Sequence, residues 1–169
     1  EFTSNHTTNS WATGKVVGGA IANKGGTINS IDADFNSNYS DQYGGAIANF
    51  VENSASSEIT SVAGNFNNNY IVVNNSEAFG GAIYNNGKIL TISGNFTGNH
   101  IAQDNLDTVT AHGGAIYNTG PNGLSISGNF LDNYISVNSG SRALGGAIYT
   151  KMNTSVVADN SQNTLFKGN

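Results

Sequence analysis

Two short motifs alternate strictly along this chain, and their alternation limits the fold more than any other feature. The first motif, Gly-Gly-Ala-Ile, begins at residues 18, 44, 80, 113 and 145. The second motif, Phe-x-x-Asn, begins at residues 2, 35, 66, 96, 130 and 166, at spacings of 33, 31, 30, 34 and 36 residues. A repeat of this length indicates a solenoid, in which each unit packs mainly on its two neighbours.

The segments between the motifs predict strands rather than helices. Apolar and polar residues alternate before each Phe, as in residues 89–93 (Ile-Leu-Thr-Ile-Ser), and such a period of two is typical of β-structure. Each repeat therefore contains three expected strands: the Gly-Ala-Ile segment, the alternating segment and the Phe segment. Three strands make one coil, so we predict an all-β parallel β-helix of about five coils with about 33 residues in each repeat.

Stacking the coils places equivalent residues in columns at the inter-strand spacing of about 4.8 Å. Isoleucine and phenylalanine columns would fill the interior, and an asparagine column would form an amide ladder at a corner. The paired glycines would allow a turn with positive φ or a close approach of neighbouring coils. The expected columns are Ile21, Ile47, Ile83, Ile116 and Ile148; Phe35, Phe66, Phe96 and Phe130; and Asn38, Asn69, Asn99 and Asn133.

The alternation of GGA[ILV] with FxxN over all 169 residues resembles the repeats of the polymorphic outer-membrane protein family, which form passenger regions of bacterial autotransporters. The resemblance implies a right-handed coil, display on the bacterial cell surface or secretion, and a role in adhesion and virulence. It also implies that residues 1–169 are one β-helix segment of a longer passenger region, whose signal peptide and membrane barrel lie elsewhere in the precursor. Many chlamydial members are cysteine-rich, whereas this chain has no cysteine.

The residue after Ile in the last three Gly-Gly-Ala-Ile motifs is a candidate binding residue. With Ile inward, strand alternation turns Tyr84, Tyr117 and Tyr149 outward as an exposed ladder for a protein or glycan partner. Two alternatives stay open: the tyrosines cover a neighbouring loop or stack only on each other, or they point inward and Ile outward. Residues 73–79 and 101–112 are expected to be loops.

Little in the sequence favours catalysis or metal binding. Asp32 and Asp34 are the nearest approach to a carboxylate pair, but they occupy positions that are polar in other repeats. His6 and His100 occupy an aromatic position after Phe-x-x-Asn, and Asp104 with Asp107 would bind calcium only loosely. We therefore expect no enzyme activity, no metal and no cofactor; a β-helix polysaccharide lyase or hydrolase is the less favoured alternative.

The expected partners follow from charge and from the resemblance. A net charge of −5 and six scattered Lys and Arg residues argue against nucleic acid, and no apolar run suits insertion of this segment into a membrane. The leading hypothesis is a non-enzymatic adhesin or scaffold that binds a host-cell protein or glycan, or other bacteria. The alternative is a structural solenoid that self-associates into fibres or cell–cell contacts.

Overall fold

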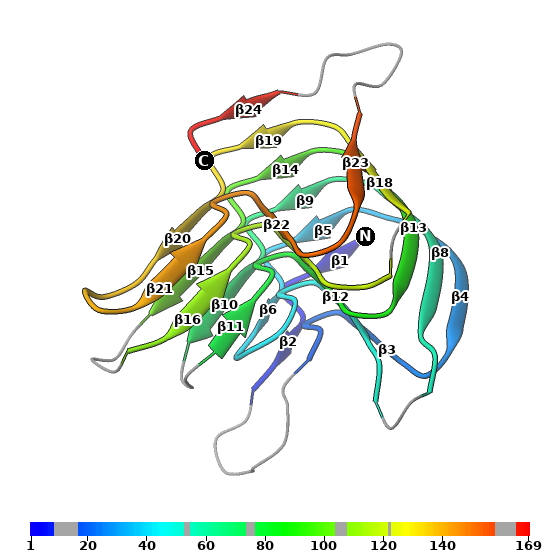
Figure 1. Cartoon of the computed structure of the whole chain (residues 1–169), viewed down its shortest axis with the longest axis horizontal. Coiled ribbons are helices and arrows are strands. Elements are labelled where there is room, and N and C mark those ends of the chain that lie inside the picture. The colour runs from blue at the N-terminus through cyan, green and yellow to red at the C-terminus, as the bar shows by residue number, and fades with distance from the viewer. Residues whose placement is uncertain (9–16, 53–54, 74–76, 104–107, 122, 158–164) are drawn as a thin grey trace.

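The computed structural model describes residues 1–8, 17–52, 55–73, 77–103, 108–121, 123–157 and 165–169, and these residues form short β-strands joined by turns. The strands assemble into five sheets, here named A to E, in which each strand pairs in parallel with the equivalent strand of the next coil. Figure 1 shows the coils stacked from the N-terminal end in blue to the C-terminal end in red. The predicted parallel β-solenoid is therefore confirmed, whereas its right-handed sense stays a prediction.

Three sheets enclose the main core, and they correspond to the three expected strands. Sheet A contains β1 (Phe2–Thr3), β5 (Phe35–Asn36), β9 (Phe66–Asn67), β14 (Phe96–Thr97), β19 (Phe130–Leu131) and β24 (Phe166–Lys167). Sheet D contains β3 (Ile21–Lys24), β7 (Ile47–Phe50), β12 (Ile83–Asn85), β17 (Ile116–Asn118) and β22 (Ile148–Thr150). Sheet E contains β4 (Thr27–Asp32), β8 (Glu58–Ala63), β13 (Lys88–Ser93), β18 (Leu124–Ser127) and β23 (Thr154–Val156).

The repeat sets the length of a coil. From Ile21 to Ile148 the chain passes through four full repeats of about 32 residues, so the five described strands of sheet D bound four turns. The predicted isoleucine column is confirmed by the register of sheet D, in which Ile21, Ile47, Ile83, Ile116 and Ile148 pair in succession. The predicted phenylalanine column is confirmed too, with ring centroids 4.7–4.8 Å apart from Phe35 to Phe130.

The asparagine of Phe-x-x-Asn turns the chain from sheet A into sheet B. The residue before it has a positive φ in each of the first five coils, for example 52° at Asn68 and 64° at Gly98. The four inner asparagines of this column are fully buried, whereas Asn5 and Asn169 at its two ends are exposed. From Asn5 to Asn133, each side-chain amide donates to the amide oxygen of the next asparagine along the stack. This confirms the predicted ladder, in which the donor–acceptor distances are 2.9 Å for Asn38–Asn69, 3.0 Å for Asn69–Asn99 and 2.9 Å for Asn99–Asn133.

The paired glycines meet both of the expected requirements. The first glycine of each pair has a positive φ, as at Gly80 with 73°. The second lies where a Cβ atom would clash with the backbone of two neighbours: at Gly81 it would come within 2.0 Å of the Gly114 carbonyl oxygen and 2.7 Å of the His100 carbonyl oxygen. This glycine therefore permits the close approach of sheet D's turn to the next coil and to sheet B.

Sheets B and C were not expected, and they correct part of the prediction that residues 73–79 and 101–112 are loops. Residues 73, 77–79, 101–103 and 110–112 are strand, while residues 74–76 and 104–107 lie outside the described residues. Sheet B contains β2 (His6–Thr7), β6 (Tyr39–Ser40), β10 (Tyr70–Val73), β15 (His100–Gln103) and β20 (Tyr134–Ser136). Sheet C contains β11 (Glu77–Phe79), β16 (Thr110–His112) and β21 (Arg142–Leu144).

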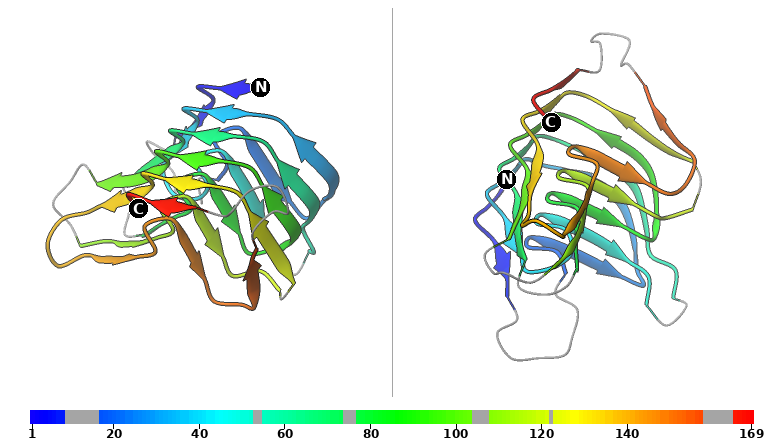
Figure 2. Two further views of the ribbon diagram at one scale, coloured as in Figure 1. Left: turned by 90° about the horizontal axis from the view of Figure 1, so that it is seen from above. Right: turned by 60° about the vertical axis from the view of Figure 1, so that its left-hand side comes forward.

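The two sheets form a lobe that projects to one side of the coil in Figure 1 and in the left view of Figure 2. Its own apolar core explains why these residues are ordered strands: the side chains of Ile71, Val73, Ile101 and Ala111 are fully buried there. The lobe is separate from the main core, which Phe, Ile and Val side chains fill between sheets A, D and E.

Candidate functional site

The tyrosines of Gly-Gly-Ala-Ile-Tyr form the expected column, but they are not an exposed ladder. Tyr84, Tyr117 and Tyr149 stack with ring centroids 5.3 Å apart at each step, on the face of sheet D opposite to the isoleucines. Tyr84 is only 6% exposed and Tyr117 only 7%, while Tyr149 is half-buried. The expectation of exposure is therefore wrong for the first two, and binding at this column stays an untested prediction.

Other aromatic side chains cover the tyrosine column. Phe79 stacks on Tyr117 with centroids 4.6 Å apart, and Tyr43 lies 4.8 Å from Tyr84. Phe50 also packs against Tyr84, and His112 lies 4.4 Å from Tyr149. Since Phe79 and His112 end strands of sheet C, this aromatic cluster attaches the lobe to the outer face of sheet D.

The electrostatics of the aromatic cluster suit packing rather than acid–base chemistry. Burial raises the pKa of Tyr43. The nearby Glu77 carboxylate, which accepts a hydrogen bond from the Tyr43 hydroxyl at 3.3 Å, raises this pKa further. Burial likewise raises the pKa of Tyr84 and Tyr117. Burial lowers the pKa of His112, assisted by Arg142 and Lys151, and neither ring nitrogen of His112 has a hydrogen-bond partner in the described part of the chain. Burial thus favours the uncharged forms of Tyr43, Tyr84, Tyr117 and His112.

A second aromatic column faces solvent. The residues that follow Phe-x-x-Asn stack along the outer face of sheet B, with centroid distances of 5.1, 5.1, 5.3 and 4.8 Å and nearly parallel planes. Sequence reasoning recognised an aromatic position here but not a surface, although an aromatic residue after five motifs was a usable signal. We call this column the aromatic row; its members are His6, Tyr39, Tyr70, His100 and Tyr134.

Stacking determines which parts of the aromatic row are accessible. Because each ring face covers the next, a ligand beside the row meets ring edges, hydroxyl groups and imidazole nitrogens. The hydroxyl groups of Tyr39, Tyr70 and Tyr134 have no hydrogen-bond partner within the described residues. Nδ1 of His100 lies 2.9 Å from the Gly98 carbonyl oxygen; as a donor there, it leaves Nε2 to accept from a ligand.

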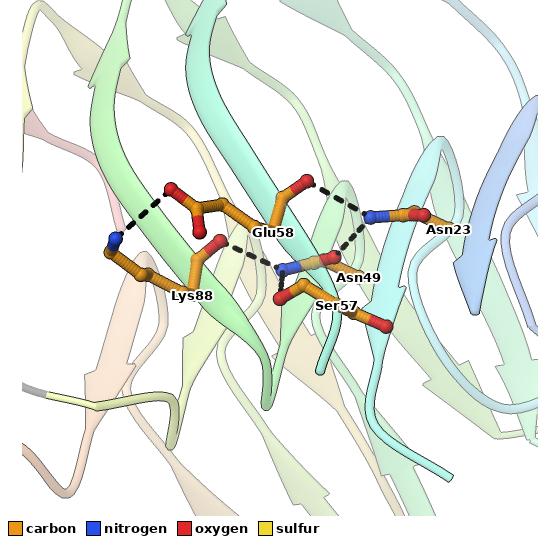
Figure 3. Close-up of polar contacts among 5 residues, drawn as sticks. All are labelled: Asn23, Asn49, Ser57, Glu58 and Lys88. Atoms are coloured by element: carbon orange, nitrogen blue, oxygen red, sulfur yellow. Dashed lines mark hydrogen bonds and ion pairs between the residues drawn. The ribbon is translucent and has the colours of Figure 1, made fainter. Parts of the chain in front are cut away.

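The polar residues at the corner between sheets D and E are fully occupied by contacts within the coil. The Asn49 side-chain amide donates to the carbonyl oxygens of Ser57 and Lys88, and Asn23 donates to Oδ1 of Asn49 (Figure 3). Asn49 also donates to Oδ1 of Asn85 at 2.9 Å. Outside them, Lys88 Nζ lies 2.9 Å from a Glu58 carboxylate oxygen. This second amide ladder continues to Asn118 and was missed, although Asn ends the first four Gly-Gly-Ala-Ile-x-Asn segments.

Asp32 and Asp34, the candidate carboxylate pair, are both exposed. Asp34 accepts from the backbone and side chain of Asn65 at 2.8 and 3.0 Å, which places it at the end of an exposed amide ladder. Asp32 is exposed on β4, and Asp104 and Asp107 lie outside the described residues. No group of three or more His, Asp or Glu side chains suited to a metal occurs in the described ranges, and none of these ranges contains an apolar helix of membrane-spanning length.

Comparison with known proteins adds no relative: no family model, no curated protein and no solved structure matches this chain. The function of this chain is therefore inferred from the geometry of the coil and from its outer surface.

Proposed function

We propose that this chain is a non-enzymatic segment of a bacterial passenger protein, displayed on the cell surface or secreted, whose solenoid presents an adhesive face. The motif alternation that resembles the polymorphic outer-membrane proteins supports this, since the residues that carry the resemblance are those that build the parallel solenoid. In this proposal the partner is a molecule on a host cell or on another bacterium.

The observation that carries the proposal is that the inward residue of each strand of sheet A is constant between coils, whereas the outward residue varies. The inward position of sheet A is Phe in all six described strands, whereas the outward position is occupied by Thr, Asn, Leu or Lys. Inner residues thus maintain the coil, and the outer surface can change without loss of the fold. Solenoids with this property provide extended binding surfaces.

Adhesion of coated beads to cultured epithelial cells tests this proposal. Beads that carry the folded fragment should bind cells more strongly than beads that carry the same fragment after denaturation. A triple serine variant of the aromatic row should lose most of this binding if the row is the adhesive face. The three substitutions are Tyr39→Ser, Tyr70→Ser and Tyr134→Ser.

A matched variant on another outer face controls for the number of substitutions. Far-UV circular dichroism should show that both variants keep the β-signal of the parent. Equal binding by both variants would move the adhesive face away from the aromatic row to another outer surface, such as that of sheet C. No binding by the parent fragment to any cell type would contradict the adhesive role. The control substitutions are Ser61→Ala, Thr91→Ala and Ser125→Ala on sheet E.

Self-association is the second candidate function, and one observation favours it. The face of the coil that includes β23 and β24 exposes large apolar side chains: Val156 is 46% exposed and Phe166 is 49% exposed. A further coil, from this chain or from another molecule, would cover them. Static light scattering over a hundredfold concentration range distinguishes the two candidates, since a constant monomer mass would count against self-association.

A further inference from the structure

The aromatic row is a hydrogen-bonding surface that recurs once per coil. It supplies one tyrosine hydroxyl or imidazole nitrogen at each step, and the steps along the solenoid axis measure 4.8–5.3 Å between ring centroids. Burial, with Tyr39 nearby, raises the pKa of Tyr70, so this hydroxyl remains a donor at neutral pH. A linear ligand that uses every step needs a chemical repeat of the same length.

This period distinguishes between classes of polymer. An extended peptide rises about 3.3 Å per residue and returns to the same face after about 6.6 Å, so it loses register with the row within a few coils. Successive sugar rings of an extended β-1,4-linked chain recur at an interval close to one coil. Alternate rings are turned over, but each ring carries hydroxyl groups on both edges, so a hydrogen-bonding group meets the row at every step. A compact helical polysaccharide with the same sugars does not keep this interval.

The surface beside the row selects for a ligand with an apolar face. On β10 and β15 the outward residues two positions after Tyr70 and His100 are Val72 and Ala102, which are half-buried, while Ile71 points into the lobe core. These two side chains form a short apolar strip beside the coils of β10 and β15, whereas the equivalent residues of the flanking coils, Asp41 and Ser136, are polar. A β-1,4-linked glucan ribbon is amphipathic in the same way, with hydroxyl groups along its edges and C–H groups on its faces.

Charge indicates a neutral polymer. The row presents tyrosine hydroxyls and imidazole rings and contains no Lys or Arg, and the exposed Asp132 precedes the corner that leads to Tyr134. The chain as a whole has a net charge of −5, which disfavours a polyanion such as an acidic polysaccharide.

We propose that the aromatic row binds a neutral, extended β-1,4-linked glucan chain along the solenoid axis, with one sugar ring per coil. The proposal names a ligand class for the adhesive role proposed above and rests on that role. Sugar hydroxyls would bridge the tyrosine hydroxyls and imidazole nitrogens, and the sugar C–H faces would lie on the strip formed by Val72 and Ala102.

Isothermal titration calorimetry with two oligosaccharide series tests the period directly. Cellobiose to cellohexaose should bind with an affinity that rises with each added ring up to cellopentaose and then levels off, because five rings span the five members of the row. Maltose to maltohexaose has the same sugar but a helical shape, and its longest member should bind at least about tenfold more weakly. Equal affinities of the two series, or no dependence on length, would overturn the proposal.

Hydroxyl deletion separates recognition from folding. Tyr39→Phe, Tyr70→Phe and Tyr134→Phe together keep the stacked rings but remove three hydrogen-bonding groups. At about 0.5–1.5 kcal/mol per hydrogen bond, this loss converts to at least about a tenfold decrease in cellopentaose affinity. The matched control, Ser61→Ala with Thr91→Ala and Ser125→Ala, removes three hydroxyl groups from the outer face of sheet E and should leave the affinity unchanged. Cell adhesion of the parent fragment without cellopentaose binding would refute this ligand while leaving the adhesive role intact.

Discussion

Replacing Asn99 by alanine tests whether the buried amide ladder stabilises the solenoid. Asn99 lies in the middle of the stack and is fully buried. Its side chain donates to the Phe66 carbonyl oxygen at 2.8 Å and to Oδ1 of Asn133 at 2.9 Å, and its Oδ1 accepts from the backbone and side-chain nitrogens of Asn69 at 3.0 Å each.

The magnitude follows from the groups that the substitution leaves without partners. These are the Phe66 carbonyl oxygen, the Asn69 backbone N–H and one N–H of the Asn69 side chain, whereas Oδ1 of Asn133 still accepts from the Asn99 backbone. At about 1–3 kcal/mol for each of these three buried polar groups left unsatisfied, the free energy of unfolding should fall by about 3–9 kcal/mol. That is a large part of the stability of an ordinary domain, which is about 5–15 kcal/mol.

Asn95→Ala is the matched control, because Asn95 belongs to an amide ladder of similar geometry on the exposed surface. It donates to Asn65 at 3.0 Å and accepts from Asn129 at 2.9 Å, but water can replace both bonds. We expect a change of about 0.5 kcal/mol or less. Urea unfolding followed by far-UV circular dichroism measures both variants, and equal losses of stability in the two would refute the argument that burial makes the ladder important.

Three other substitutions test the core, the glycine contacts and the buried histidine. Phe96→Ala should lower the free energy of unfolding by about 3–5 kcal/mol in urea unfolding, and a loss below about 1 kcal/mol would mean that the phenylalanine stack is not tightly packed. Gly81→Ala should prevent or strongly weaken folding, as judged by the thermal midpoint, because its Cβ would overlap backbone atoms of two neighbouring segments; Gly123→Ala, where a Cβ would have no neighbour within 4 Å but φ is 107°, should cost less. For His112, whose pKa is lowered by burial, stability should be constant above the unfolded pKa of about 6.5 and should decrease as the pH falls from there toward the depressed folded pKa. His112→Leu should remove this part of the pH dependence, and an identical profile of thermal midpoint against pH in both proteins would contradict the assignment.

The sequence by itself determined the coil and its internal columns. Ile, Phe and Asn recur at one position in every repeat, and parallel stacking at a spacing of about 4.8 Å brings identical residues into contact, so their partners are copies of themselves. This is why the contacts of Phe66 with Phe96 and of Asn69 with Asn99 could be predicted without knowledge of any other part of the chain.

Only the tertiary structure decided which outward residues remain accessible. Strand alternation correctly turned Tyr84 and Tyr117 away from the isoleucines, but it could not show that Tyr43, Phe79 and other side chains cover them. These covering residues come from segments that differ between repeats and from the lobe, parts of which the sequence predicted to be loops. Tyr70, by contrast, lies on the outer face of sheet B and is only half-buried. Burial on the outer surface of a solenoid depends on contacts between segments that differ in sequence. The repeat pattern specifies the contacts inside the coil but not these outer contacts.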